Sequence, residues 1–209
     1  MRAVLVWFLI AVCLSAGGAV QGQSRLPVTV AEMLRLEKGE ILLTGSIDAS
    51  QSGMVEGRIL IPASPERVWS VVVNPNEFAN KIQKHLRTVR VVRENPKTSV
   101  LDCQVEVISF LPRINYVVES FYEPCRKIDF RRVGGSLRDF RGQWLLEPAD
   151  NGRKTLVTYA MYIDPGFFVP QWIMRAGLRR ELPQTLSGIK DRVNQLEMQT
   201  AAAPVHSHS

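Results

Sequence analysis

Between residues 86 and 163 the chain alternates apolar and polar side chains in six short segments, and turn-forming residues separate these segments. Alternation with a period of two is typical of strands that bury one face. Connections as short as Gly134-Gly135 and Asn151-Gly152 force neighbouring strands to run antiparallel. The pattern therefore predicts one antiparallel sheet, with strands over residues 86–93, 98–110, 114–122, 127–133, 136–147 and 154–163.

An apolar stripe near the C-terminus is expected to cover this sheet. Apolar residues recur there at spacings of four and three, which predicts one face of a long α-helix that starts near Pro170. They are Leu182, Leu186, Ile189, Val193 and Leu196. Pro183 either kinks this helix or begins a new one. Since residues such as Asp102 and Arg131 make the other face of the sheet polar, the cover lies on one side only.

The segment before the sheet predicts one more strand and two short helices. Residues 54–61 form the strand. Ser64 suits a helix N-cap, Pro65 the first helical position, and Glu66 the positive end of the helix dipole. Asn74-Pro75 ends that helix and starts a second one. Further upstream, residues 28–38 predict a short amphipathic helix, and residues 40–47 a strand.

The N-terminus has the composition of a secretory signal peptide. A positive start at Arg2 precedes an apolar run over residues 3–14, and small residues follow. The run is too short to span a bilayer. We therefore expect cleavage between Ala19 and Gln23 and export to the periplasm or the extracellular space. The expected division is a signal peptide at 1–22, an N-terminal extension at 23–53, a ligand-binding domain at 54–198 and a disordered tail at 199–209.

The chain has 26 basic and 20 acidic residues, a net charge of +6. This excess either favours anionic membrane surfaces or simply keeps the protein soluble. Basic and acidic residues are interleaved, which argues against nucleic acid as a partner. Cys103 and Cys125 are expected to be free thiols, because pairing across a turn at residues 111–113 puts Cys103 opposite residues 120–122, too far from Cys125.

Four stretches resemble the START-like superfamily, in particular its polyketide-cyclase and coenzyme-Q-binding branch. They are residues 59–69 (ILIPASPERVW), 142–148 (GQWLLEP), 152–159 (GRKTLVTY) and 165–173 (PGFFVPQWI). The resemblance covers roughly residues 54–197. It implies an α+β helix-grip fold, in which a curved antiparallel β-sheet wraps around a long C-terminal helix. It also implies a cavity for a sterol, quinone, isoprenoid, polyketide or fatty-acyl ligand.

Three groups of residues are candidates for contact with such a ligand or with a membrane. The expected cavity lining is Cys103, Val105, Tyr116, Val118, Tyr122, Phe130, Phe140, Trp144, Tyr159, Met161, Trp172, Leu186 and Ile189. The candidate polar contacts are Arg132, Arg138 and Ser120. The candidate membrane contacts are Phe167, Phe168, Trp172, Arg175 and Arg179. The competing interpretations are packed core for the first group, solvent-facing strand ends for the two arginines and a buried hydrophobic staple for the loop.

Signals for catalysis are weak. His85 is the only histidine outside the tail, and the sequence lacks the common hydrolase, zinc and phosphate-loop motifs. We therefore assign no catalytic residue, metal or cofactor. Three functions stay open: a carrier of a hydrophobic ligand, a cyclase- or dehydratase-like enzyme on a polyketide-type substrate, and a protein-interaction domain.

Overall fold

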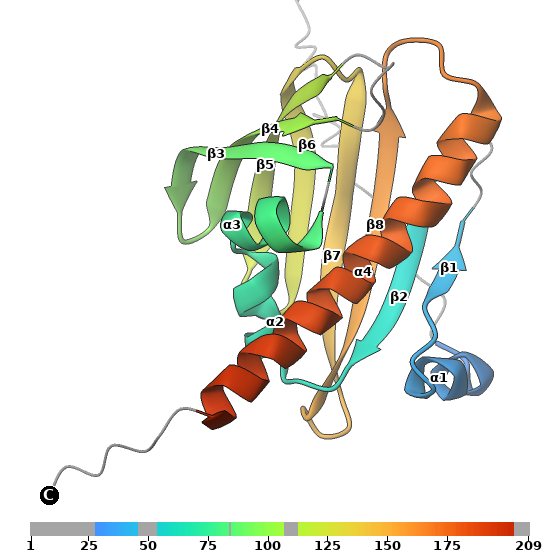
Figure 1. Cartoon of the computed structure of the whole chain (residues 1–209), viewed down its shortest axis with the longest axis vertical. Helices are drawn as coiled ribbons and strands as arrows, with labels where there is room; N and C mark the ends of the chain where they lie inside the picture. Colours follow the sequence, from blue (N-terminus) through green and yellow to red (C-terminus); the bar gives the residue numbers. More distant parts are fainter. Residues whose placement is uncertain (1–27, 46–53, 84, 107–112, 203–209) are drawn as a thin grey trace, which may run out of the picture.

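Eight strands form one antiparallel sheet in the order β1-β2-β8-β7-β6-β5-β4-β3 (Figure 1). The computed structural model describes residues 28–45, 54–83, 85–106 and 113–202, so the predicted signal peptide lies outside the described residues. The strands are β1 (Leu42–Thr44), β2 (Val55–Ile61), β3 (Leu86–Asn95), β4 (Thr98–Val105), β5 (Ile114–Glu123), β6 (Lys127–Gly135), β7 (Asp139–Ala149) and β8 (Lys154–Asp164). The sheet is strongly curved, and the predicted α+β helix-grip architecture is confirmed.

Helices cover the concave face of the sheet. They are α2 (Pro65–Val72), α3 (Pro75–Glu77), the π-helix η1 (Phe78–Ile82) and α4 (Gln171–Ala202). As the sequence predicts, Ser64 caps α2 by accepting a hydrogen bond from the Arg67 amide, and Pro65 occupies its first turn. Asn74 caps α3 in the same way, through the Asn76 amide.

The final helix α4 is continuous over 32 residues, with Pro183 inside it. The alternative in which Pro183 begins a new helix is therefore wrong. Helix α4 also extends to Ala202, so residues 199–202 of the predicted disordered tail are helical, and residues 203–209 lie outside the described part. In Figure 1, α4 runs diagonally across β2 and β8, while α2 and α3 lie beside it over the strands nearer to β3.

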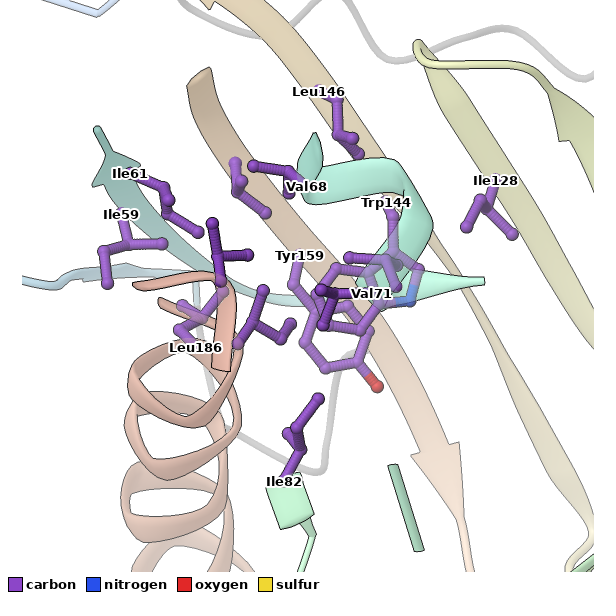
Figure 2. Packing of buried hydrophobic residues seen from close by; sticks show 14 of the residues in the cluster. Ile59, Ile61, Val68, Val71, Ile82, Ile128, Trp144, Leu146, Tyr159 and Leu186 are labelled. Atoms are coloured by element: carbon purple, nitrogen blue, oxygen red, sulfur yellow. The ribbon is translucent and has the colours of Figure 1, made fainter. Parts of the chain in front are cut away.

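The main core lies where α4 crosses β2 and α2. Leu186, Ile189 and Val193 of α4 have no exposed surface, and they pack with Ile59 and Ile61 of β2. Figure 2 shows Leu186 close to these two isoleucines, with Val68 and Val71 of α2 in the same cluster. Gly57 of β2 makes this close approach possible, because an added Cβ would lie 2.8 Å from Leu186 Cδ1.

The N-terminal extension packs against the outer face of the sheet and adds one strand to its edge. The sequence alone assigns no role to it. Helix α1 (Val30–Glu37) has a complete capping box between Thr29 and Glu32, and β1 pairs with β2. Leu36 and Leu42 bury themselves against Leu60 and Leu156, which alternate with the concave-face residues of β2 and β8. The expected cover on one side only is therefore wrong at this end, where α1 covers the outer face.

The register of β4 and β5 differs from the prediction. Cys103 lies opposite Tyr116, not opposite residues 120–122. The error arises because β4 ends at Val105, whereas the alternation suggested a strand as far as residue 110. The conclusion drawn from that register holds all the same, since Cys103 and Cys125 are both free.

Candidate functional site

A cavity of about 130 Å³ lies between the concave face of the sheet and the segment from α2 to η1. Its strand walls come from β3 to β8, and its roof from α2, α3 and η1. The sequence predicts a gap between the sheet and the last helix. The cavity exists, but it lies under α2, α3 and η1, so the predicted position is wrong. No α4 residue belongs to the described lining, because the buried stripe of α4 is packed into the core.

Aromatic rings form a continuous chain along the wall of the cavity. Trp144 and Tyr159, opposite each other on β7 and β8, stack at 3.7 Å between ring centres with an angle of 3° (Figure 2). Tyr159 lies 6.2 Å from Phe130, which lies 5.1 Å from Phe140. Phe140 meets Tyr116 edge-on at 5.2 Å. Such contacts hold the rings in fixed orientations, so the wall is rigid and apolar.

None of the described lining residues carries a formal charge. The polar atoms in the wall belong to neutral groups, among them the hydroxyls of Tyr116, Tyr159 and Ser120 and the thiol of Cys103. Burial raises the pKa of the Cys103 thiol from 9.0 to about 12. Burial also raises the pKa values of Tyr116 and Tyr159 well above that of an ordinary phenol. At neutral pH all these groups are protonated, and they offer hydrogen bonds without charge.

A short hydrogen bond stiffens one side of the cavity. The Ser99 and Tyr122 hydroxyl oxygens lie 2.5 Å apart, across β4 and β5. Burial raises the pKa of Tyr122, and the hydrogen bond with Ser99 partly offsets this effect. The ring of Tyr122 also meets Trp69 of α2 edge-on at 5.9 Å. The sheet and the helical roof are thereby joined at the cavity wall.

Most of the expected lining residues do lie on this cavity. They are Cys103, Tyr116, Val118, Tyr122, Phe130, Phe140, Trp144 and Tyr159. The other five lie elsewhere among the described residues: Val105 ends β4, Met161 belongs to the main core, Leu186 and Ile189 are packed in α4, and Trp172 is 70% exposed.

Sequence reasoning missed the roof and the β3 side of the cavity. The missed lining residues are Val72, Val73, Pro75, Phe78, Gln83, Leu86, Val89, Leu101 and Ile128. Alternation does place Leu101 and Ile128 on the inward face, although neither is among the expected lining residues. Nothing in the irregular stretch around Phe78 indicates which side it covers.

The three candidate polar contacts have different surroundings. Ser120 is buried and lines the cavity. Arg138 is exposed and pairs with Asp164, with 3.3 Å between its Nη1 and the carboxylate, so it belongs to the surface. Arg132 follows Ile128 and Phe130 on the concave face of β6, and its Nη2 donates to the Gly135 carbonyl oxygen at 2.8 Å.

The candidate membrane contacts gather where β8 leads into α4. Phe168 is 90% exposed and Trp172 70%, and Phe167 and Arg179 are exposed as well, whereas Arg175 is half-buried. The interpretation of this loop as a buried staple is therefore wrong. No helix in the described part has the length and apolar character needed to cross a bilayer. Within the same part, no group of histidine, cysteine and acidic side chains could hold a metal ion.

Comparison with known proteins agrees with this architecture. A search of curated proteins found no match. Among solved structures, the chain is similar to the Zhui aromatase/cyclase of a Streptomyces species (TM-score 0.62, 16% identity, 72% of this chain and 98% of that one). It is also similar to a STAR-related lipid transfer protein of Xanthomonas axonopodis (TM-score 0.62, 16% identity, 74% and 92%). A human StAR-related lipid transfer protein gives a TM-score of 0.59 at 12% identity, over 80% of this chain and 93% of that one.

These structural similarities lie at low identity and show the fold. Family membership comes from the sequence itself. The model of one family, described as polyketide cyclase/dehydrase and lipid transport, matches residues 61–190, which is more than half of the chain. The matched region contains the whole helical roof and strands β3 to β8 of the curved sheet. The chain therefore belongs to the polyketide cyclase/dehydrase and lipid transport family.

Proposed function

We propose that this protein binds a hydrophobic small molecule or lipid in the cavity and carries it to or from a membrane. The observation that carries the proposal is the lining, in which aromatic and aliphatic side chains combine with a few neutral hydrogen-bonding groups. Sites for small hydrophobic ligands have this composition. The candidate ligands are of the sterol, quinone, isoprenoid or fatty-acyl type.

The size of the cavity supports a bound guest. A site for one water molecule needs about 10–15 Å³, so about 130 Å³ offers room for several times that. Protein interiors are ordinarily close-packed. A hollow of this size in an otherwise packed domain therefore supports a bound ligand.

The exposed loop before α4 supports exchange at a membrane. Phe168 and Trp172 present large apolar surfaces to solvent, and Arg179 lies two turns into the helix behind them. Aromatic side chains next to cationic ones favour the interface of an anionic bilayer. Export of the chain through its N-terminal segment would place this loop within reach of such membranes, and that localisation is part of the proposal.

Analysis of the purified protein tests the ligand. Wild-type protein, purified without detergent and examined by native mass spectrometry, is expected to carry a hydrophobic molecule that organic solvent extracts. Val118→Phe, which fills the cavity from β5, should lose this molecule. Val133→Phe is the matched control, since Val133 lies exposed on β6 and outside the described lining. Repeated recovery of an empty wild-type protein that also binds no added lipid would refute the proposal.

Catalysis has less support than binding. Acid–base catalysis is most efficient with groups whose pKa lies near the working pH. The described lining contains no carboxylate and no histidine, and the thiol and phenols there have raised pKa values. The protein-interaction alternative also has less support, because it requires no cavity. A filled interior in a ligand-free crystal would favour it.

A further inference from the structure

The stacked rings of Trp144 and Tyr159 each carry a hydrogen-bond donor that the described part of the fold leaves unused. Both residues are 6% exposed, and both line the cavity. Neither the Tyr159 hydroxyl nor the Trp144 indole N–H has a hydrogen-bond partner among the described residues. In Figure 2 the oxygen and the nitrogen lie on the side of the ring pair that faces away from Leu186 of α4.

A molecule in the cavity can reach these two donors. Neither atom is among the described polar atoms that lack both a partner and accessible surface, so each keeps some accessible surface. Because both residues line the cavity, that surface belongs to its wall. Burial raises the pKa of Tyr159, and no hydrogen bond opposes this effect. The hydroxyl therefore stays protonated and remains a donor.

The phenols of the other lining tyrosines differ from that of Tyr159, because they have partners. The Tyr122 hydroxyl oxygen lies 2.5 Å from that of Ser99. The Tyr116 hydroxyl is within hydrogen-bond reach of the Cys103 thiol. Tyr159 and Trp144 are therefore the aromatic residues of the described wall whose donors remain available to a guest.

The chemistry of the two donors defines the group that would satisfy them. An indole N–H donates and never accepts, so its partner must be an acceptor. A buried donor without an acceptor is destabilising. A carboxylate offers acceptor oxygens, but its charge would enter a described wall that contains no cation, and burying an unpaired charge costs far more than burying a neutral polar group. A carbonyl oxygen offers the same lone pairs without the charge.

We infer that the ligand of this cavity is uncharged and carries a carbonyl-type oxygen that accepts a hydrogen bond from the Tyr159 hydroxyl, with the Trp144 indole N–H as a second donor in the same wall. This inference rests on the proposed function and narrows its ligand class. Quinones and ketone-bearing sterols have the expected form, with an apolar body and an uncharged acceptor. Fatty acids in their ionised form do not.

The test uses three probes that share a flat naphthalene body. One is 2-acetylnaphthalene, which carries a carbonyl; the second is 2-isopropenylnaphthalene, in which a CH₂ group replaces the carbonyl oxygen; the third is 2-naphthoate, which is ionised at neutral pH. Calorimetric titration of the wild type should give at least about tenfold weaker binding of the carboxylate than of the ketone, because its charge has no counter-charge in the described wall.

Tyr159→Phe removes the hydroxyl and keeps the ring. It should lower the ratio of ketone affinity to hydrocarbon affinity about two- to tenfold, which is the contribution of a neutral hydrogen bond. Using this ratio cancels the different hydration of the two probes, since both proteins are titrated from the same solution. Tyr162→Phe is the matched control on the outer face of β8, where the Tyr162 ring lies 4.4 Å from the guanidinium of Arg141. It should keep the ratio of the wild type.

Thermal unfolding without ligand separates a binding role from a structural one. Tyr159→Phe should unfold at the temperature of the wild type or at a higher one, because the hydroxyl that it removes has no partner among the described residues. A large loss of thermal stability would show that the hydroxyl holds the fold, and would overturn the inference. An unchanged ketone-to-hydrocarbon ratio, or tighter binding of the carboxylate than of the ketone, overturns the inference and leaves the cavity function standing. A wild type that binds none of the three probes overturns both.

Discussion

Arg192 of α4 binds Glu77 of α3 through two hydrogen bonds, with 2.5 Å between Nε and Oε2 and 3.2 Å between Nη2 and Oε1. Both side chains are largely buried, and Lys81 of η1 reaches the same carboxylate at 3.2 Å. The pair is the charged link between the long helix and the segment that covers the cavity. Pro75 and Phe78, on either side of Glu77, line the cavity directly.

Glu77→Gln should lower the free energy of unfolding by about 2–4 kcal/mol at neutral pH, because it leaves the buried Arg192 without its counter-charge. The hydrogen bond from Arg192 holds the pKa of Glu77 below the ordinary value of 4.5, against the effect of burial. A depressed pKa contributes stability above pH 4.5, and this contribution is lost as the pH falls through the folded-state value. The difference between wild type and variant should therefore shrink in acid.

Urea unfolding of both proteins at neutral pH and at acid pH measures this difference. Asp102→Asn is the control, since Asp102 pairs with the exposed Arg90 at 2.8 Å and such a surface pair contributes less than about 1 kcal/mol. A variant as stable as the wild type at neutral pH would show that the link has no energetic importance.

Gly142→Ala should destabilise the fold by about 1–3 kcal/mol, as overpacking in a core commonly does. An added Cβ at Gly142 would lie 2.2 Å from the Ala160 carbonyl oxygen and 2.5 Å from Phe130 Cζ. The backbone of β8 cannot yield as a side chain can, and Phe130 would have to leave its position in the cavity wall. Gly142→Ala should therefore weaken ligand binding as well, which titration with 2-acetylnaphthalene measures.

Gly177→Ala is the same type of substitution with the opposite expected effect on stability. Nothing lies within 4 Å of a Cβ built at Gly177, which is in a helical position of α4. That variant should be more stable than the wild type by about 1 kcal/mol, from helix propensity alone. Equal stability of the two alanine variants would refute the reasoning about Gly142.

Cys103 should resist alkylation by iodoacetamide at mildly alkaline pH. Its thiol is buried and its pKa is raised to about 12, so almost none of it is the reactive thiolate. Measured by mass spectrometry on the Cys125→Ser variant, labelling should require unfolding by denaturant. Rapid labelling of the native protein would mean that the cavity wall opens readily to solvent.

Replacing both Phe168 and Trp172 by serine should lower binding to phosphatidylglycerol vesicles at least about tenfold, because each exposed aromatic contributes apolar area at an interface. Stability should change by less than about 0.5 kcal/mol, as for surface substitutions generally. Co-sedimentation with vesicles measures the binding. Val92→Ser, at an exposed position on β3, is the control and should bind as the wild type does. An equal loss in the control would mean that the effect is not local to this loop.

The fold was predictable because its elements carry strong local signals. Ser64 and Pro65 fix the start of α2, the spacing of Leu182, Leu186 and Ile189 fixes the buried face of α4, and glycine-rich turns separate the strands. The end of β4 was not predictable in the same way. Alternation continues beyond Val105, although pairing with β5 stops there, and periodicity alone does not report where pairing stops.

The strand residues in the wall of the cavity could be predicted from the sequence. The helical residues in its roof could not. Alternation identifies which strand residues point inward, so Tyr116, Phe130 and Trp144 could be named. Which helix lies above them depends on how closely each helix approaches the sheet. Gly57 carries that information, because its missing side chain lets Leu186 touch β2 and closes the space under α4. Gly57 within the predicted strand at residues 54–61 was therefore the sequence feature that could indicate where a helix packs closely against the sheet.

The packing of α4 also decides how a guest could enter and leave. Lifting this helix would expose Leu182, Leu186, Ile189 and Val193, at about 1.5–3 kcal/mol for each side chain. The sum is comparable to the net stability of a whole domain, about 5–15 kcal/mol. Passage of a ligand between α4 and the sheet would therefore cost about as much free energy as unfolding the domain. We therefore expect exchange to run past α3, η1 and the start of β3, where the described residues contribute one charged link and the buried side chains of Ile82 and Leu86.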